Sequence, residues 1–111
     1  MNSKIFFVVA TAAILAGCGA GHDGGEFVGK WQNVDQAKVT EVIERNGDQF
    51  ILTETLPNPF KANELKTIRS VATLNTAGNL VIPSSFGVVE LAIDKKTGNL
   101  ISSGAEFKRV E

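Results

Sequence analysis

From Phe27 onward, the chain consists of short apolar runs separated by turn-forming residues every 8 to 12 positions. The runs are rich in Val, Ile, Leu, Phe and Thr, and no window sustains a helical period, so the pattern predicts antiparallel β-structure. A chain of 111 residues suffices for one small domain. Eight strands are predicted, over 27–34, 38–45, 48–56, 65–74, 79–83, 86–93, 99–103 and 105–110.

The predicted fold is all-β, a small antiparallel up-and-down β-barrel of about eight short strands. Closure removes the exposed sheet edges that favour aggregation, so the barrel is preferred to the alternative, a two-sheet β-sandwich. The predicted core consists of Phe27, Trp31, Val39, Ile43, Phe50, Leu52, Leu74, Leu80, Val89, Leu91, Ile93, Leu100 and Phe107.

Two turn signals set the expected geometry of the strands at 38–45 and 48–56. Asn46-Gly47 predicts a two-residue type I′ turn, which needs positive φ at both central residues. The two prolines at 57 and 59 predict a longer loop without ladder pairing. With the turn at 46–47, the facing inner pairs are Ile43 with Phe50, Glu41 with Leu52 and Val39 with Glu54.

The N-terminal residues have the features of an export signal. Lys4 precedes an apolar run, 5–16, that is shorter than the roughly 20 residues needed to span a bilayer. The residues Leu15-Ala16-Gly17-Cys18 resemble the lipobox of bacterial lipoproteins at all four positions. The resemblance implies cleavage before Cys18, a diacylglycerol on its thiol and a further acyl chain such as palmitate on the new N-terminus. The alternative is a buried free cysteine after a chance apolar segment.

The lipobox resemblance divides the chain into three parts. These are a signal peptide (1–17), a lipidated cysteine with a flexible Gly-rich tether (18–25) and a β-barrel domain (26–111). His22 lies in the tether, where we expect a solvated linker residue. Gly19 stands where lipoproteins retained in the inner membrane of enteric bacteria have Asp, so the resemblance points to the bacterial outer membrane, with the domain facing the periplasm or the surface.

Gly29 and Trp31 open the predicted barrel and are similar to the Gly-x-Trp start of lipocalins and fatty-acid-binding proteins. In those families the tryptophan plugs the closed end of the barrel, and the resemblance implies this role for Trp31. The layout is also similar to that of the small lipocalin-like lipoproteins of bacterial envelopes. The domain is shorter than a lipocalin, so a smaller interior is implied.

Composition excludes several classes of function. A formal net charge of −1 argues against nucleic acid as a partner, because nucleic-acid-binding surfaces are usually basic. One histidine and one cysteine exclude a structural zinc site of the usual His/Cys kind, and they allow no catalytic triad. We therefore expect no metal, no cofactor and no enzymatic activity.

Five side chains are candidates for ligand or partner binding: Trp31, Glu41, Phe50, Glu54 and Phe60. Glu41 and Glu54 fall on the apolar face of the predicted hairpin, where paired carboxylates can perform acid/base chemistry because burial raises a pKa. The alternative is that they lie at the barrel rim or turn to water through a register slip. Phe60 is either an anchor for a partner or a lid that folds back over the barrel.

The predicted function is that of a membrane-anchored, non-enzymatic binding or interaction module that contacts another envelope protein. Two alternatives remain open: a lipocalin-like carrier of a small apolar ligand, and an inhibitor or immunity protein against an envelope-targeting enzyme. A carrier needs a pocket of at least about 300 Å3. An inhibitor needs a protruding loop with a charged or aromatic tip.

Overall fold

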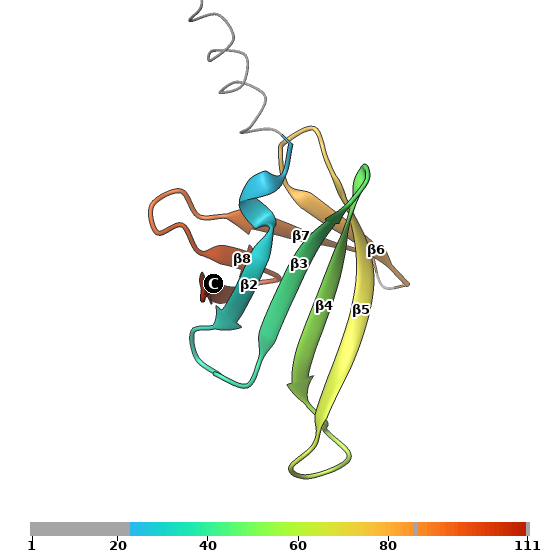
Figure 1. Cartoon of the computed structure of the whole chain (residues 1–111), viewed down its shortest axis with the longest axis vertical. Coiled ribbons are helices and arrows are strands. Elements are labelled where there is room, and N and C mark those ends of the chain that lie inside the picture. The colour runs from blue at the N-terminus through green and yellow to red at the C-terminus, as the bar shows by residue number, and fades with distance from the viewer. Residues whose placement is uncertain (1–22, 86, 111) are drawn as a thin grey trace, which may run out of the picture.

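A computed structural model describes residues 23–85 and 87–110 of the chain. The predicted signal peptide (1–17), Cys18 and the tether as far as His22 lie outside these ranges. Eight antiparallel strands close into a barrel in the order β2-β3-β4-β5-β6-β7-β8-β9 (Figure 1). The predicted all-β barrel is therefore confirmed, and the β-sandwich alternative is excluded.

The sheet is a meander that closes where β9 pairs with β2. The strands are β2 (Gly29–Asn33), β3 (Thr40–Asn46), β4 (Gln49–Pro57), β5 (Leu65–Leu74), β6 (Leu80–Ser84), β7 (Gly87–Ile93), β8 (Leu100–Ser102) and β9 (Ala105–Arg109). One turn of 3-10 helix, η1 (Gly25–Phe27), precedes them. No helix in the described ranges is long and apolar enough to cross a membrane. Each predicted strand is present, with bounds that differ by two residues at most.

The β3–β4 hairpin turns one residue later than predicted. Its two central residues are Gly47 and Asp48, because Asn46 pairs with Gln49. Gly47 has a φ of +64° and Asp48 has a negative φ, which is the pattern of a type II′ turn with glycine at its first central position. The predicted type I′ turn at 46–47 is therefore wrong.

The later turn shifts every facing pair of this hairpin by two residues. Because side chains alternate with a period of two, each residue keeps its predicted face and changes only its partner. Ile43 faces Leu52, and Glu41 faces Glu54 directly. The predicted pairs that are wrong are Ile43 with Phe50, Glu41 with Leu52 and Val39 with Glu54.

The core contains almost all of the residues predicted for it. Those that are buried are Phe27, Trp31, Ile43, Phe50, Leu52, Leu80, Leu91, Leu100 and Phe107. The remaining predicted core residues are partly buried and pack against this cluster; they are Val39, Leu74, Val89 and Ile93. Ala72, which was not predicted, is also fully buried and lies opposite Phe50 in the β4–β5 ladder.

One end of the barrel is covered by η1 and sealed by Trp31; we call it the closed end. The Trp31 indole is fully buried, and its Nε1 donates to the carbonyl of Phe27 at 2.9 Å. The guanidinium of Arg109 lies 4.2 Å from the indole centroid. The same guanidinium donates to the carbonyls of Val28 and Glu26, at 2.9 and 2.7 Å. Arg109 therefore ties the last strand to η1 across the plug.

Residues of the predicted tether contact the barrel at Asp23 and Gly24. Gly24 is buried with a φ of +82°, and a Cβ there would lie 2.5 Å from Cζ of Phe50. Arg45 donates to the carbonyl of Asp23 at 2.6 Å and lies 3.6 Å from its carboxylate. Only glycine fits the close approach at position 24.

The β4–β5 hairpin extends beyond the other strands at the end of the molecule opposite η1 (Figure 1). Pro57 still pairs with Leu65, so the prediction that both prolines stand outside the ladder is wrong for Pro57. The loop that follows is closed by a bond from the Asn58 amide to the Glu64 carbonyl, at 2.9 Å. Phe60 in this loop is 89 % exposed, so it does not fold back as a lid.

Candidate functional site

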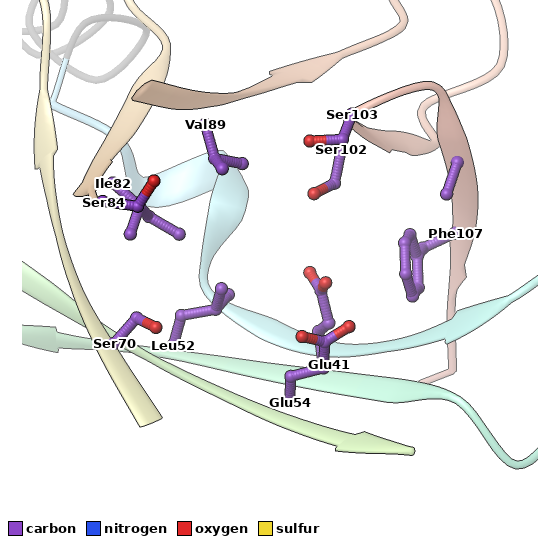
Figure 2. A pocket seen from close by; sticks show the side chains of 11 residues that line it. Glu41, Leu52, Glu54, Ser70, Ile82, Ser84, Val89, Ser102, Ser103 and Phe107 are labelled. Atoms are coloured by element: carbon purple, nitrogen blue, oxygen red, sulfur yellow. The ribbon is translucent and has the colours of Figure 1, made fainter. Parts of the chain in front are cut away.

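A cavity of about 410 Å3 lies inside the barrel, lined by Glu41 and Glu54 among others (Figure 2). Its lining comes from β3 through β9 and from the turn between β8 and β9. Ser84 and Ser103 belong to the lining and are exposed, so the cavity reaches solvent at these residues. This volume is at the lower end of the range for small-molecule sites.

The cavity exists because inward residues change from apolar to acidic at one level of the barrel. Along β4 the inward positions are Phe50, Leu52 and then Glu54, of which the first two are buried. Along β3 they are Ile43, which is buried, and then Glu41. The two glutamates face one another across the β3–β4 ladder. The apolar core therefore ends at the level of this pair.

Glu41 is the one charged or polar side chain in the described ranges that is fully buried, with 3 % of its surface exposed. Its Oε1 has no hydrogen-bond partner among the described residues. Burial, and secondly the charge of Glu54, raise the pKa of Glu41 to about 7. Burial also raises the pKa of Glu54. The pair therefore holds a proton at a pH at which an exposed glutamate is ionised.

Four serine hydroxyls add polar groups to the lining. Ser102 and Ser103 lie across the cavity from the two glutamates in the view of Figure 2. Their position follows from a type I′ turn, since Ser103 and Gly104 both have positive φ, +50° and +85°. Ser70 lines the cavity from β5, and Ser84 from β6.

Apolar side chains complete the walls. They are Leu52, Ile82, Val89, Ala105 and Phe107. Part of the space arises because β5 and β6 separate after only two pairs, Thr73 with Val81 and Leu74 with Leu80. Beyond these pairs, Ser70 on β5 and Ile82 on β6 border the cavity without being ladder partners.

The structure brings together only two of the five predicted site residues. Glu41 and Glu54 line the cavity, as their predicted face requires. Trp31 seals the closed end, and Phe50 is buried there beside Gly24, with Arg45 4.8 Å from its ring centroid. Neither aromatic side chain lines the cavity, so their predicted role in contacting a ligand is not supported by this site. Phe60 is also remote from it, at the exposed tip of the β4–β5 hairpin.

The lining serines were missed by the sequence-based reasoning. Strand alternation contained a signal, because Ser70 shares the inward face with Ala72, and Ser102 shares it with Leu100. The predicted register covered only the strands at 38–45 and 48–56. It therefore did not show what lies opposite these serines. A serine at an inward position also occurs where strands end in turns, as at Ser84 and Ser103.

The site combines negative charge, hydroxyl groups and apolar walls. Its described lining contains no Lys, Arg or His. In the parts of the chain that the structure describes, no group of three or more His, Cys, Asp or Glu side chains is placed to hold a metal ion. The arrangement can accept hydrogen bonds, hold a proton and attract a cation.

Comparison with known proteins gives no relative from which to transfer a function. No family model matches the chain, and no curated protein and no solved structure matches it. The function is therefore argued from the site and from the N-terminal sequence.

Proposed function

We propose that this chain is a lipid-anchored, non-enzymatic binding protein of the bacterial envelope whose barrel cavity takes a small molecule. The observation that carries the proposal is the cavity itself, about 410 Å3 in volume, with a buried carboxylate oxygen, Oε1 of Glu41, that has no hydrogen-bond partner in the described ranges. A buried carboxylate without a hydrogen bond is costly to maintain in a fold. A ligand that supplies the missing partner removes this cost.

The N-terminal sequence supports the anchor. The order of Lys4, the apolar run and the four residues that end at Cys18 is the order found in bacterial lipoproteins. Diacylglycerol at Cys18 with a further acyl chain gives an effectively permanent hold, because each buried methylene contributes roughly 0.8 kcal/mol. Gly19 favours the outer membrane over retention in the inner one.

The mixed lining modifies the ligand expected for a lipocalin-like carrier. Leu52, Val89 and Phe107 suit the apolar part of a ligand, whereas Glu41 and Glu54 oppose a wholly apolar one. We therefore propose a ligand with one polar end and one apolar end. Its size is limited by a cavity at the small end of the usual range.

A matched pair of adjacent valines on β7 allows a sharp test. Val89 lines the cavity, whereas Val88 points outward and is 66 % exposed. The full-length protein is purified from bacterial membranes in mild detergent and weighed by native mass spectrometry. We expect an adduct of discrete mass on the wild type and on Val88→Trp, and its loss from Val89→Trp, whose indole fills the cavity. A bare mass for the wild type, or equal adducts on both variants, contradicts the proposal.

Phe60 favours a second candidate function, the docking of an envelope protein or an envelope-targeting enzyme. Its ring is 89 % exposed at the tip of the longest hairpin, and its amide is fixed by a 2.9 Å bond to the Asn58 side chain. Exposed aromatic residues on fixed loops are common anchors in protein interfaces. A photo-crosslinking amino acid at position 60 is expected to capture one discrete partner in cells. The matched position is Val110, an exposed residue just after β9, where no capture is expected.

A further inference from the structure

The Glu41–Glu54 pair lies in a cavity whose described lining carries no positive charge. Glu41 is 3 % exposed, its Oε1 is unpartnered within the described ranges, and Figure 2 shows both carboxylates directed into the cavity. Like charges directly opposite one another in a sheet are destabilising. The pair is thus a buried negative site that is incomplete without a proton or a cation.

The described lining of the cavity contains no positively charged side chain. Lys66 on β5 has the same side-chain parity as Ser70, but it is exposed and is not among the lining residues. The lining side chains from β5, β6, β7, β8 and β9 are serine hydroxyls and apolar groups. The strand partner of Glu41 on β2 is Trp31, which is uncharged. Arg109 lies beyond that indole and already donates to the carbonyls of Val28 and Glu26.

The shape and the walls favour an organic cation over a metal ion. A cavity of about 410 Å3 is far larger than a single ion, and its walls include Leu52, Val89 and Phe107. Two carboxylates give few of the 6 to 8 oxygen ligands that Ca2+ takes. A protonated amine, by contrast, has three donors for the carboxylates and an attached carbon skeleton for the apolar walls.

We infer that the cavity selects small molecules that carry a protonated amine, with the ammonium group between Glu41 and Glu54 and the carbon skeleton against Leu52, Val89 and Phe107. This inference rests on the proposed function, because it names the ligand class of the same cavity. The ammonium group donates to the Glu41 Oε1 that lacks a partner, and its charge offsets the repulsion between the carboxylates.

Ligand binding of this kind is linked to the proton that the empty pair holds. Burial and the charge of Glu54 raise the pKa of Glu41 to about 7, so the empty site is partly protonated near neutral pH. An ammonium ion takes the place of that proton, and the proton is released to solvent. Affinity for an amine is therefore expected to rise as the pH rises through about 7, by roughly five- to tenfold between about pH 6 and about pH 7.5.

Calorimetric titration of the full-length protein in mild detergent tests the inference with matched probes. The probes are 2-phenylethylamine, its neutral analogue 2-phenylethanol, and calcium chloride. We expect the amine to bind at least tenfold more tightly than the alcohol at about pH 7.5, with uptake of a proton by the buffer. Glu41→Gln and Glu54→Gln are each expected to weaken amine binding at least tenfold and to leave alcohol binding unchanged. Glu44→Gln, an exposed carboxylate on the same strand, is the control and is expected to bind as the wild type does.

The outcomes separate this inference from the proposed function. Equal binding of amine and alcohol, or amine binding that survives Glu41→Gln, overturns the amine selectivity and leaves a small-molecule cavity. Calcium binding that displaces the amine and is lost in both glutamine variants assigns the pair to a metal ion and also overturns the inference. If neither organic probe binds and the purified protein has a bare mass, the inference and the proposed function both fail. The near-ultraviolet circular dichroism of Trp31 confirms that each variant is folded.

Discussion

At the scale of single residues, the molecule has two carboxylates at inward-facing positions of the barrel, where apolar side chains are usual. Glu41 is the next inward-facing residue to Ile43 on β3, and Glu54 is the next one to Leu52 on β4. Their mutual repulsion and the burial of Glu41 oppose folding whenever both are ionised. Buried charges that reduce stability in this way often occur at binding sites, because a bound ligand offsets their cost.

The free energy of unfolding is expected to depend on pH through Glu41. Its pKa is about 7 in the folded protein against 4.5 for an ordinary glutamate, so the folded state binds more protons in between. The free energy of unfolding therefore falls as the pH rises from about 4.5 to about 7. Glu41→Gln removes this loss and is expected to exceed the wild type by about 3 kcal/mol above pH 7, and to approach it in acid. Urea unfolding at a series of pH values measures both, with Glu44→Gln as the control; parallel profiles for all three proteins would contradict the assignment.

Gly24 fixes the entry of the chain into the barrel. Gly24→Ala combines a φ of +82° with a Cβ that meets the Phe50 ring at 2.5 Å. We expect a loss of about 1–3 kcal/mol in the free energy of unfolding. Gly25→Ala is the matched control, because its Cβ would meet only the exposed carboxylate of Asp23, at 3.1 Å. Equal stability of the two variants, measured by thermal unfolding, would show that residue 24 is not packed as described.

At the scale of elements, alternation was more predictable than register. The runs of β-forming residues predicted all eight strands, and their inner faces followed from where Phe50, Leu52 and Leu91 lie. The hairpin register did not follow, because Asn46-Gly47 and Gly47-Asp48 are both acceptable two-residue turns. The direct opposition of Glu41 and Glu54 depends on that choice and was therefore missed. The place of Ser70 in the cavity wall depends on the separation of β5 from β6, which no local pattern encodes.

Two phenylalanines distinguish the projecting hairpin from the barrel wall. Phe107 on β9 is 3 % exposed and lines both the core and the cavity, whereas Phe60 is 89 % exposed. Phe107→Ala is expected to lower the free energy of unfolding by about 3–5 kcal/mol. Phe60→Ala is expected to change it by less than about 0.5 kcal/mol. Denaturant titration compares the two, and a marked loss of stability in Phe60→Ala would mean that the loop packs on the barrel.

At the scale of the whole molecule, the barrel has two different ends. The closed end is filled by η1, Trp31 and Arg109, and the chain enters there. The other end contains the cavity. The β4–β5 hairpin projects at that end (Figure 1). Asp23, the first described residue, and the proposed binding site thus lie at opposite ends of the barrel.

The anchor is tested by Cys18→Ser. Without the thiol no diacylglycerol can be attached, so the variant is expected to remain an unprocessed precursor of higher peptide mass. Intact-mass analysis and detergent-phase partitioning compare it with the wild type, for which we expect a processed, acylated chain in the detergent phase. A Cys18→Ser protein that is still processed and still partitions into detergent contradicts lipidation at this residue.

Together with the proposed lipid anchor, the entry of the chain at the closed end bears on the phase from which a ligand of the proposed site would arrive. If Cys18 is acylated as proposed, the five residues to Asp23 span about 18 Å at most, so the closed end would stay near the membrane surface. The cavity would then open toward the aqueous compartment, and ligands would reach it by diffusion through water instead of sideways from the lipid. A protein held in this way would sample solutes in the water next to the membrane, at a height limited by the length of its tether.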